Sequence, residues 1–448
     1  MSGSNLVRQN QLLIFYNVPK LQAPHFVARN ALFTRLKAFF ECRTITSSTL
    51  VAILVGRGGA GKTQLALNYC RHMKESGKLR AIFWVDASSR NAVYRSMETI
   101  ANWMIPGRVL DNPNATVAAV RDVLESWSDA WLMVFDNMDR PSEFPDIQNF
   151  FPDSRHGSIL VTSRHTSFKR LGLSIELDGM EREECLQLLG HSTADTEELT
   201  AAEEVLVLLG YLPLAIDQAQ AYISQRQLRL REFVDEYESR KRSIMEETPV
   251  FWQYRRTSSD AEEETSLSLL TTWEMSLSQL GIGDGRAVGL RDILTVFAFF
   301  HPVGISGEMF TTTLEDPDDT ASPMSLFNTN GNWDRIKFED AVIQMQQLSL
   351  LQFSRRNGNQ IVVSLHSMVS EWLRMRLDED SRLAFLSTAV SHLCNYVDST
   401  DRNDFATRQE TLSHLNTICQ STEFRIKSDH FLRACFSFGV FYQDWLLQ

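Results

Sequence analysis

A short apolar run followed by a glycine-rich loop constrains this chain more than any other feature. Residues 51–55 have the pattern of a buried strand, and residues 56–63 read Gly-Arg-Gly-Gly-Ala-Gly-Lys-Thr, a complete G-x-x-x-x-G-K-T loop. Such glycines let backbone N–H groups turn inward around a β-phosphate, while Lys62 reaches the β- and γ-phosphates and the Thr63 hydroxyl can ligate Mg²⁺. A helical pattern follows the loop. Strand, loop and helix together predict a cradle for nucleotide phosphates.

Length and composition limit the classes of protein that fit. A chain of 448 residues suggests about two to four domains. With 43% hydrophobic and 22% charged residues the composition is that of a soluble globular chain, and the net charge of -12 disfavours broad affinity for nucleic acid or anionic membranes. The 6 cysteines show no metal-ligand spacing, so we expect reduced core thiols. Because no signal core or membrane-length apolar run is present, we expect an intracellular, cytoplasmic location.

The first half of the chain alternates short apolar runs with helical patterns, which is typical of a parallel sheet with helices on both faces. The expected strands are residues 53–55, 81–85, 131–135, 158–161 and 174–177. Beyond Gly179, amphipathic helical patterns replace the strand patterns and predict a helical subdomain. The polar segment 240–264 is predicted to be a solvated connecting loop, with a regulatory segment as the alternative.

The order of elements after residue 286 is typical of a winged-helix domain. The expected elements are helices over 288–299, 306–312 and 335–348, strands over 350–354 and 360–365, and a last helix over 367–377. The Asn357-Gly358 step between the two strands is a strong hairpin signal and would form the wing.

From residue 380 the pattern is helical throughout. Within it, residues 438–442 read Phe-Gly-Val-Phe-Tyr and partly match the first helix of a tetratricopeptide repeat. An unrelated amphipathic helix explains this short match equally well.

A second strand carries an acid where Mg²⁺ would bind. Residues 131–136 are an apolar run that ends in Asp136, so this carboxylate is predicted to hold Mg²⁺ opposite Thr63, with an ordinary strand-terminal aspartate as the alternative. In many hydrolysing P-loop proteins a second acid follows, but here that position is Asn137, whose amide cannot take a proton. Asp139 is expected to point differently from the Asn137 side chain. We therefore expect slow hydrolysis, with Lys62, Asp136 and Asn137 as the catalytic candidates.

Three further residues are candidates for the site. Arg164 ends the buried strand that begins at residue 157, at the sheet edge where ligands of open α/β sheets bind, so it is predicted to sense a γ-phosphate. The alternative is a surface arginine that balances nearby acids. Pro213 suits the first turn of a new helix. His366 ends the second wing strand, and a single histidine in that setting is more often structural than functional.

These pieces in this order resemble the NB-ARC class of STAND nucleotide-binding switch proteins, over about residues 24–377. The segments that carry the resemblance are residues 26–29 (F-V-A-R, for the F-V-G-R entry), 56–63 (Walker A), 135–139 (F-D-N-M-D, Walker B), 159–164 (I-L-V-T-S-R, first sensor), 210–215 (G-Y-L-P-L-A, for G-L-P-L-A) and 365–367 (L-H-S, for M-H-D). Departures from the pattern are Ala28 for Gly, Asn137 for an acid and Ser367 for Asp. Residues 294–302 also look like the fungal branch of the class.

The resemblance implies roles for individual residues. Backbone near Val27 and Arg29 would frame the adenine and Pro213 would pack against it. Arg164 would sense the γ-phosphate of ATP, and His366 would touch the β-phosphate of ADP and lock a closed state. The implied ligands are ADP, ATP and Mg²⁺. The nucleotide-binding candidates are Val27, Arg29, Gly56, Gly58, Gly59, Ala60, Gly61, Lys62, Thr63, Gln64, Arg164, Pro213 and His366, and the metal candidates are Thr63 and Asp136.

The predicted fold is an α/β P-loop NTPase domain with a parallel sheet, followed by a helical subdomain, a winged helix and a C-terminal α-helical region. The expected domains are an N-terminal extension over 1–23, without the effector domain typical of the class, a P-loop domain over 24–178, a helical subdomain over 179–285, a winged helix over 286–379, and a helical region over 380–448 where tetratricopeptide repeats would start.

The function implied is an ADP/ATP switch of an intracellular NLR-like signalling receptor of innate immunity, locked by ADP and opened to an oligomer by nucleotide exchange. Its expected partners are an adenine nucleotide, further copies of the chain in the ATP state, and proteins or a ligand bound through C-terminal repeats. Neither a membrane nor nucleic acid is expected.

Two other functions are alternatives. A multiple-turnover P-loop ATPase is disfavoured by Asn137 and by the lack of a recognisable substrate domain. A DNA-binding regulator would use the winged helix, with phosphate contacts from Arg355, Arg356, Arg374 and Arg376, and the acidic balance of the chain disfavours it.

Overall fold

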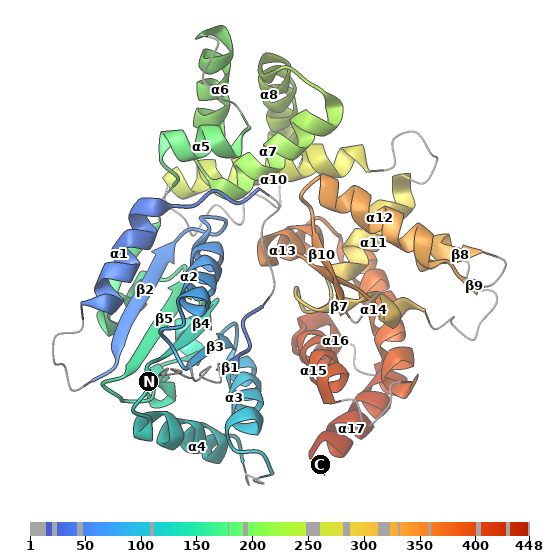
Figure 1. The fold of residues 1–448 in the computed structure, drawn as a ribbon. Coiled ribbons are helices and arrows are strands. Elements are labelled where there is room, and N and C mark those ends of the chain that lie inside the picture. Colours follow the sequence, from blue (N-terminus) through green and yellow to red (C-terminus); the bar gives the residue numbers. More distant parts are fainter. Residues whose placement is uncertain are drawn as a thin grey trace, which may run out of the picture. The chain divides into compact units, whose positions relative to one another are not determined.

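The computed structural model forms two compact units, residues 1–188 and 189–448 (Figure 1). The described residues are 15–19, 25–42, 48–107, 112–177, 179–190, 196–247, 260–280, 287–311, 323–329, 332–356, 360–399, 405–426 and 431–446. The first unit carries a 6-stranded sheet, and the second is mostly helical with sheets of 3 and 2 strands.

The sheet of the first unit is parallel throughout, with the strand order β1-β3-β4-β5-β2-β6. Its strands are β1 Phe15–Tyr16, β2 Leu50–Gly56, β3 Ala81–Asp86, β4 Trp131–Asp136, β5 Gly157–Ser163 and β6 Leu173–Leu177. The strands expected from the sequence are all confirmed. Because the strands run in one direction, the carboxyl ends of β2, β4 and β5 meet at one edge of the sheet.

Strand β1 was not expected, and it lies in the segment predicted to be an N-terminal extension. It pairs with β3 through Phe15 and Tyr16. The Asn17 side chain then continues the pairing, because its Oδ1 accepts the Trp84 N–H at 2.7 Å and its Nδ2 donates to the Trp84 carbonyl at 3.3 Å. The sheet therefore begins before the boundary expected at residue 24. A two-residue strand is too short to give an alternating pattern in the sequence.

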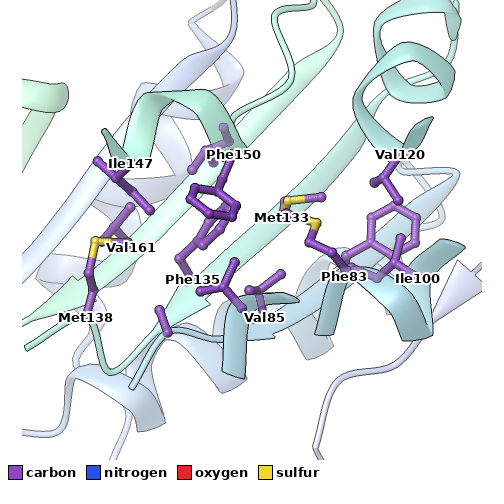
Figure 2. Packing of buried hydrophobic residues seen from close by; sticks show 14 of the residues in the cluster. Phe83, Val85, Ile100, Val120, Met133, Phe135, Met138, Ile147, Phe150 and Val161 are labelled. Atoms are coloured by element: carbon purple, nitrogen blue, oxygen red, sulfur yellow. The ribbon is translucent and has the colours of Figure 1, made fainter. Parts of the chain in front are cut away.

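Helices cover both faces of this sheet, as expected. They are α1 Asn30–Glu41, α2 Lys62–Ser76, α3 Arg90–Met104 and α4 Pro113–Ser126, with short 3-10 helices η1 Pro141–Glu143, η2 Ile147–Phe150 and η3 Thr166–Leu171. On one face Phe83 and Met133 pack with Ile100 of α3 and Val120 of α4 (Figure 2). The alternate strand residues, such as Leu54, Ile82 and Leu160, are fully buried, and α2 contacts β2 and β5.

Polar residues define where several helices begin. The Ser89 hydroxyl accepts the Ala92 N–H at the start of α3, and the Asn112 side chain accepts the Ala115 N–H at the start of α4. In the second unit the Asp334 carboxylate accepts two backbone N–H groups at the start of α12. Each of these side chains satisfies donors that a helix leaves unpaired in its first turn.

Helices follow the sheet where the helical subdomain is expected, and the extent of this subdomain over 179–285 stays a prediction. Its helices are α5 Arg182–Leu188, which belongs to the first unit, and α6 Thr196–Leu208, α7 Pro213–Arg226, α8 Leu230–Glu247 and α10 Asp260–Gln279 of the second unit. The prediction of a loop over 240–264 is wrong at both ends, because α8 continues to Glu247 and α10 begins at Asp260. Glu, Lys, Arg and Met are strong helix formers, so high charge here marked helix rather than loop. Residues 248–259 lie outside the described residues.

The next segment has helices and strands near the positions that the sequence predicted. They are α11 Ala287–Phe297, η4 Gly307–Phe310, α12 Arg335–Gln347, β10 Gln352–Arg356, β11 Gln360–Ser364 and α13 Ser367–Met375. The short 3-10 helix η5 Pro323–Phe327 was not predicted. Strands β10 and β11 form the expected antiparallel pair, whose Asn357-Gly358 turn lies outside the described residues. Strand β7 Ile305–Ser306 adds an unexpected third strand, and β8 Asn328–Thr329 pairs with β9 Asn332–Trp333. The helix expected over 306–312 is the short 3-10 helix η4.

The C-terminal region is helical, as expected. Its helices are α14 Glu379–Ser399, α15 Phe405–Gln420, α16 Thr422–Ile426 and α17 Leu432–Leu446. Helix α14 buries an apolar stripe at Leu386, Val390, Leu393 and Tyr396. The partial repeat match at residues 438–442 lies within α17, and whether it starts a repeat array stays a prediction.

Two histidines are buried in this region. His414 of α15 accepts the His301 N–H at its Nδ1, and its Nε2 lies 3.1 Å from the Gly304 carbonyl oxygen, so Nε2 carries the proton. His392 of α14 packs its ring against Phe310, with ring centroids 5.4 Å apart. Burial lowers the pKa of His392 to about 4 and that of His414 to about 3. Both imidazoles are therefore neutral in the folded protein near neutral pH.

These histidines predict a loss of stability in mild acid. Below the ordinary histidine pKa of about 6.5 the unfolded chain takes up protons that the folded chain refuses, so the free energy of unfolding falls as the pH drops toward 4. The variant His392→Phe should remove about 2 kcal/mol of this acid-dependent loss. Urea unfolding at several pH values checks it. The variant His165→Phe, at an exposed position, is the control for the substitution itself. A pH dependence in His392→Phe equal to that of the wild type would contradict the prediction.

Candidate nucleotide-binding site

The glycine-rich loop joins β2 to α2 in a conformation that depends on its glycines. Gly59 and Gly61 have φ angles of 76° and 85°, a left-handed region that other residues rarely adopt. A Cβ on Gly56 would lie 2.1 Å from the Leu177 carbonyl oxygen of β6. The turn inside the loop is closed by the Ala60 N–H, which donates to the Arg57 carbonyl at 3.3 Å. The backbone conformation of the loop thus requires glycine at these positions even without a bound ligand.

Lys62 begins α2 and folds back over the loop. Its Nζ lies 2.8 Å from the carbonyl oxygens of both Gly56 and Arg57. Burial lowers the pKa of Lys62 to about 8, with Asp139 and Asp136 raising it and Arg164 lowering it. The helix N-cap is Gly61, which makes no side-chain cap. A helix N-terminus and an ammonium group at one loop suit a phosphate chain, because both stabilise negative charge.

Asp136 lies at the end of β4, where two hydroxyl groups hold it. The Thr63 hydroxyl donates to Asp136 Oδ1 at 2.9 Å and the Thr162 hydroxyl donates to the same oxygen at 2.6 Å. Thr162 also accepts the N–H of Asn137, which has a φ angle of 69°. Burial raises the pKa of Asp136 to about 6, although both hydroxyl groups oppose the rise. The predicted metal pair, Thr63 and Asp136, is thus brought together.

The donor set at Asp136 suits Mg²⁺ held mainly by phosphate and water. Within the described ranges, no group of three or more His, Cys, Asp or Glu side chains could hold a metal ion. One carboxylate and one hydroxyl group are the usual protein share of a P-loop Mg²⁺ site, whose other ligands come from the nucleotide and water. The residues present therefore fit a cation that binds together with a nucleotide.

Thr162 is a site residue that the sequence reasoning missed. It is buried at the end of β5, and its hydroxyl links Asp136 to the backbone of Asn137. The signal was present, since Thr162 precedes Arg164 by two positions and β5 is next to β4 in the sheet. A strand's alternation does not reveal whether a threonine faces an acid or the core.

Arg164 is paired with Asp139. The Asp139 carboxylate accepts the Arg164 backbone N–H at Oδ1 (2.7 Å) and the Arg164 Nε–H at Oδ2 (2.5 Å). The segment after β4 is also joined to the end of β5, because the Met138 N–H donates to the Thr162 carbonyl and the Ser163 hydroxyl donates to the Met138 carbonyl. The structure thus has the acid pairing that was the alternative reading of Arg164, at the sheet edge where a γ-phosphate sensor was predicted.

Arg29 connects the segment before the sheet to the phosphate loop. Its Nη1 donates to the Ala60 carbonyl at 3.1 Å and its Nη2 donates to the Gly179 carbonyl, while Nε lies 3.6 Å from a Glu184 oxygen. Arg29 therefore fixes the loop to the residues after β6. Val27 lies just before it, and both residues are half-buried. Gly58 in the loop and Gln64 in the first turn of α2 are half-buried as well.

Two candidates lie in the second unit. Pro213 is at the start of α7, as predicted, after a turn in which Gly210 and Tyr211 have φ angles of 61° and 54°. His366 is the N-cap of α13, where its Nδ1 accepts the Met368 N–H at 3.2 Å and its side chain is exposed. The structure thus gives His366 a capping role, and its contact with a nucleotide stays a prediction.

In the part of the chain that the structure describes, no helix is both long and apolar enough to cross a membrane. All 6 cysteines of the sequence are free thiols.

Comparison with solved structures gives distant likenesses. An ORC1 protein of Aeropyrum pernix in complex with DNA has a TM-score of 0.34 and 15% identity, with 81% of this chain and 96% of that chain covered. A Drosophila ORC structure bound to DNA has a TM-score of 0.35 and 11% identity, with 83% and 94% covered. At these scores the likeness says nothing of what this chain binds.

Sequence comparison is more specific. A nucleotide-binding leucine-rich repeat (NLR)-like protein of Hyaloscypha variabilis is 23% identical over 249 residues, which cover 51% of this chain and 25% of the relative. The chain thus matches about a quarter of that protein's length. The NB-ARC domain family matches residues 40–198, which include the phosphate loop, Asp136 and Arg164. Residues 40–198 therefore form an NB-ARC domain of the STAND class of P-loop NTPases, in a chain that is similar to a fungal NLR-like protein.

Proposed function

We propose that this chain is an ADP/ATP-binding molecular switch of an NLR-like signalling receptor, with slow hydrolysis. The observation that carries the proposal is the network at the sheet edge, in which Thr63 and Thr162 hold Asp136 beside the loop that contains Lys62. These groups are suited to hold a Mg²⁺–nucleotide phosphate chain. The NB-ARC match and the fungal relative support a switch within a receptor of the innate immune type.

The residues of the loop would bind the phosphates, and Thr63 and Asp136 would hold Mg²⁺. When bound, Mg²⁺ neutralises charge on the β- and γ-phosphates. The Lys62 ammonium would exchange its two carbonyl contacts for phosphate oxygens. Backbone near Val27 and Arg29 would frame the adenine, since Arg29 already fixes this segment to the Ala60 carbonyl of the loop.

Slow hydrolysis is supported by the lack of a suitable base. Position 137 is an amide, and the nearest following acid, Asp139, accepts hydrogen bonds from Arg164 at both oxygens. A carboxylate held in this way is poorly placed to orient an attacking water. The alternative function, a multiple-turnover ATPase, would be favoured by steady-state turnover at or above about one per second.

The switching step requires that ADP and ATP favour different arrangements of the chain. His366 would contact the β-phosphate of ADP and lock a closed state, and exchange for ATP would open the chain to oligomers. Within the second unit, Trp273 of α10 and Trp372 of α13 pack with ring centroids 5.4 Å apart, and Arg376 pairs with Glu274 at 2.8 Å. These contacts couple the helical subdomain to the proposed winged helix, so Pro213 and His366 would respond together.

The second alternative, a DNA-binding regulator, has less support. Its proposed phosphate contacts on β10, Arg355 and Arg356, form ion pairs with Glu339 and Glu410, and Arg376 pairs with Glu274. A cation that already has an acidic partner gains less from a phosphate. DNA binding whose association constant falls with salt concentration, with a slope of several units in a plot of log K against log salt, would favour this alternative.

Replacing Lys62 with Ala should weaken ADP and ATP binding by at least about tenfold, because a charge-assisted contact to phosphate is lost. Calorimetric titration of the purified chain, after removal of co-purified nucleotide, measures it. The exposed Lys78, which pairs with Glu41, provides the matched control Lys78→Ala. Equal affinity in the Lys62 variant and the wild type would reject the proposed phosphate site.

Replacing Asp136 with Asn should have opposite effects on the stability of the nucleotide-free protein and on Mg²⁺ binding. The raised pKa means that, above pH 6, the folded chain carries a buried carboxylate charge at a cost to the free energy of unfolding, and this cost vanishes as the pH falls toward 4. Asp136→Asn should therefore stabilise the nucleotide-free protein by about 2 kcal/mol at pH 7.5 and by much less at pH 4.5.

The same variant should lose the gain in ATP affinity that Mg²⁺ provides. Thermal unfolding and titration with and without Mg²⁺ measure the two effects, and Asp122→Asn on the exposed face of α4 is the control. A variant that is destabilised at pH 7.5, or that keeps the Mg²⁺ effect, would count against this account of Asp136.

His366→Ala should speed ADP release by about tenfold if the imidazole contacts the β-phosphate. Because His366 also caps α13, His366→Asn is the matched variant, since an amide oxygen can accept the Met368 N–H in its place. Release of a fluorescent ADP analogue in stopped flow distinguishes the two roles. Faster release in both variants supports the lock, whereas faster release in His366→Ala alone assigns the effect to capping.

A further inference from the structure

Asp139 holds the proposed γ-phosphate sensor through two hydrogen bonds. One oxygen accepts the backbone N–H of Arg164 at 2.7 Å, and the other accepts its Nε–H at 2.5 Å. The side chains of Arg164 and Asp139 have relative exposures of 33% and 15%, so water screens this pair less than a pair on the open surface. The contact therefore fixes both the backbone and the guanidinium group of Arg164.

The pair lies at the phosphate end of the sheet. Strand β5 lies between β2 and β4, so the loops that follow these three strands share one edge. The Met138 N–H donates to the Thr162 carbonyl at 3.0 Å, which holds the segment before Asp139 against the end of β5. Beyond the larger effect of burial, which lowers it, the pKa of Lys62 is raised by Asp139 and lowered by Arg164. Asp139 and Arg164 thus share the surroundings of the lysine that would grip the phosphates.

A γ-phosphate would meet opposing influences at this edge. It would be attracted by Arg164, but the Asp139 carboxylate already offsets part of the charge of that cation. Because Arg164 is the proposed sensor of the γ-phosphate, which ADP lacks, a weaker attraction by Arg164 lowers the affinity for ATP more than the affinity for ADP. A carboxylate in this position therefore changes the preference between the two nucleotides more than it changes binding as such.

We propose that Asp139 competes with the γ-phosphate for Arg164 and thereby biases the site toward ADP. The inference rests on the proposed nucleotide site. Asp139 acts through Arg164, as a residue that sets nucleotide preference and takes no part in bond breaking. In the ATP state the charge of the Arg164 guanidinium would be shared between the Asp139 carboxylate and a phosphate oxygen.

The test is the ratio of the ADP dissociation constant to that of a non-hydrolysable ATP analogue, both with Mg²⁺, measured by calorimetry on the full chain. Asp139→Asn should raise this ratio by about fivefold or more, because the competing charge is removed. Arg164→Gln should lower it. In the double variant the ratio should stay within about twofold of that of Arg164→Gln, because Asp139 no longer has its partner. Asp122→Asn, which removes a carboxylate from the exposed face of α4, is the matched control and should leave the ratio unchanged.

Each other outcome overturns the proposal. An unchanged ratio in Asp139→Asn means that Asp139 does not compete with the γ-phosphate. A lowered ratio means that Asp139 orients Arg164 toward the γ-phosphate. An equal rise in the Arg164→Gln background means that the carboxylate acts on the phosphates directly. If Asp139→Asn does not fold, Arg164→Gln still decides, because an unchanged ratio there excludes Arg164 as the sensor.

The proposed function is tested separately by the Lys62→Ala variant. Binding that the wild type has and this variant loses supports the site, whatever the ratio in Asp139→Asn. A wild type that binds neither nucleotide overturns the proposed function and this inference together.

Discussion

The carboxylate of Asp136 is the point on which the nucleotide site depends. Hydroxyl groups from the first turn of α2 and from the end of β5, those of Thr63 and Thr162, donate to one of its oxygens. This arrangement joins the phosphate loop, the end of β4 and the end of β5 through a single atom. It is possible because three parallel strands end at the same edge of the sheet.

The same carboxylate is costly in the absence of a cation. Burial raises its pKa to about 6, and the two hydroxyl groups compensate only in part. A nearby Mg²⁺ would favour the charged form, so the groups that suit the metal are those that destabilise the nucleotide-free fold. Lys62 has the same character, since burial lowers its pKa to about 8 and a phosphate would favour its charged form. In our proposal, nucleotide and metal therefore contribute to stability as well as to signalling.

Much of the fold could be predicted from the sequence because its local patterns are strong. Continuous apolar runs identified the buried strands, and alternating runs identified the β10–β11 pair. Two kinds of element could not be predicted from the sequence. Strand β1 is too short to show a period, and it is ordered by pairing with β3 and by the Asn17 contacts with Trp84. The sequence predicts a loop where the end of α8 and the start of α10 lie, because a charged sequence does not by itself separate a solvent-exposed helix from a connector.

For the site, the sequence by itself predicted the phosphate loop with Lys62 and Thr63, because their chemistry depends on residue type and on spacing within one strand-loop-helix unit. It predicted Asp136 because an acid ends a second apolar strand. Only the tertiary structure decided which side chains surround them. The Thr162 bridge and the Asp139–Arg164 pair join residues 26 and 25 positions apart, which the register of β4 against β5 brings into contact. Arg29 reaches Gly179 across 150 positions in the same way. Such contacts follow from sheet order and strand register, which depend on the packing of the whole domain and leave no local pattern in the chain.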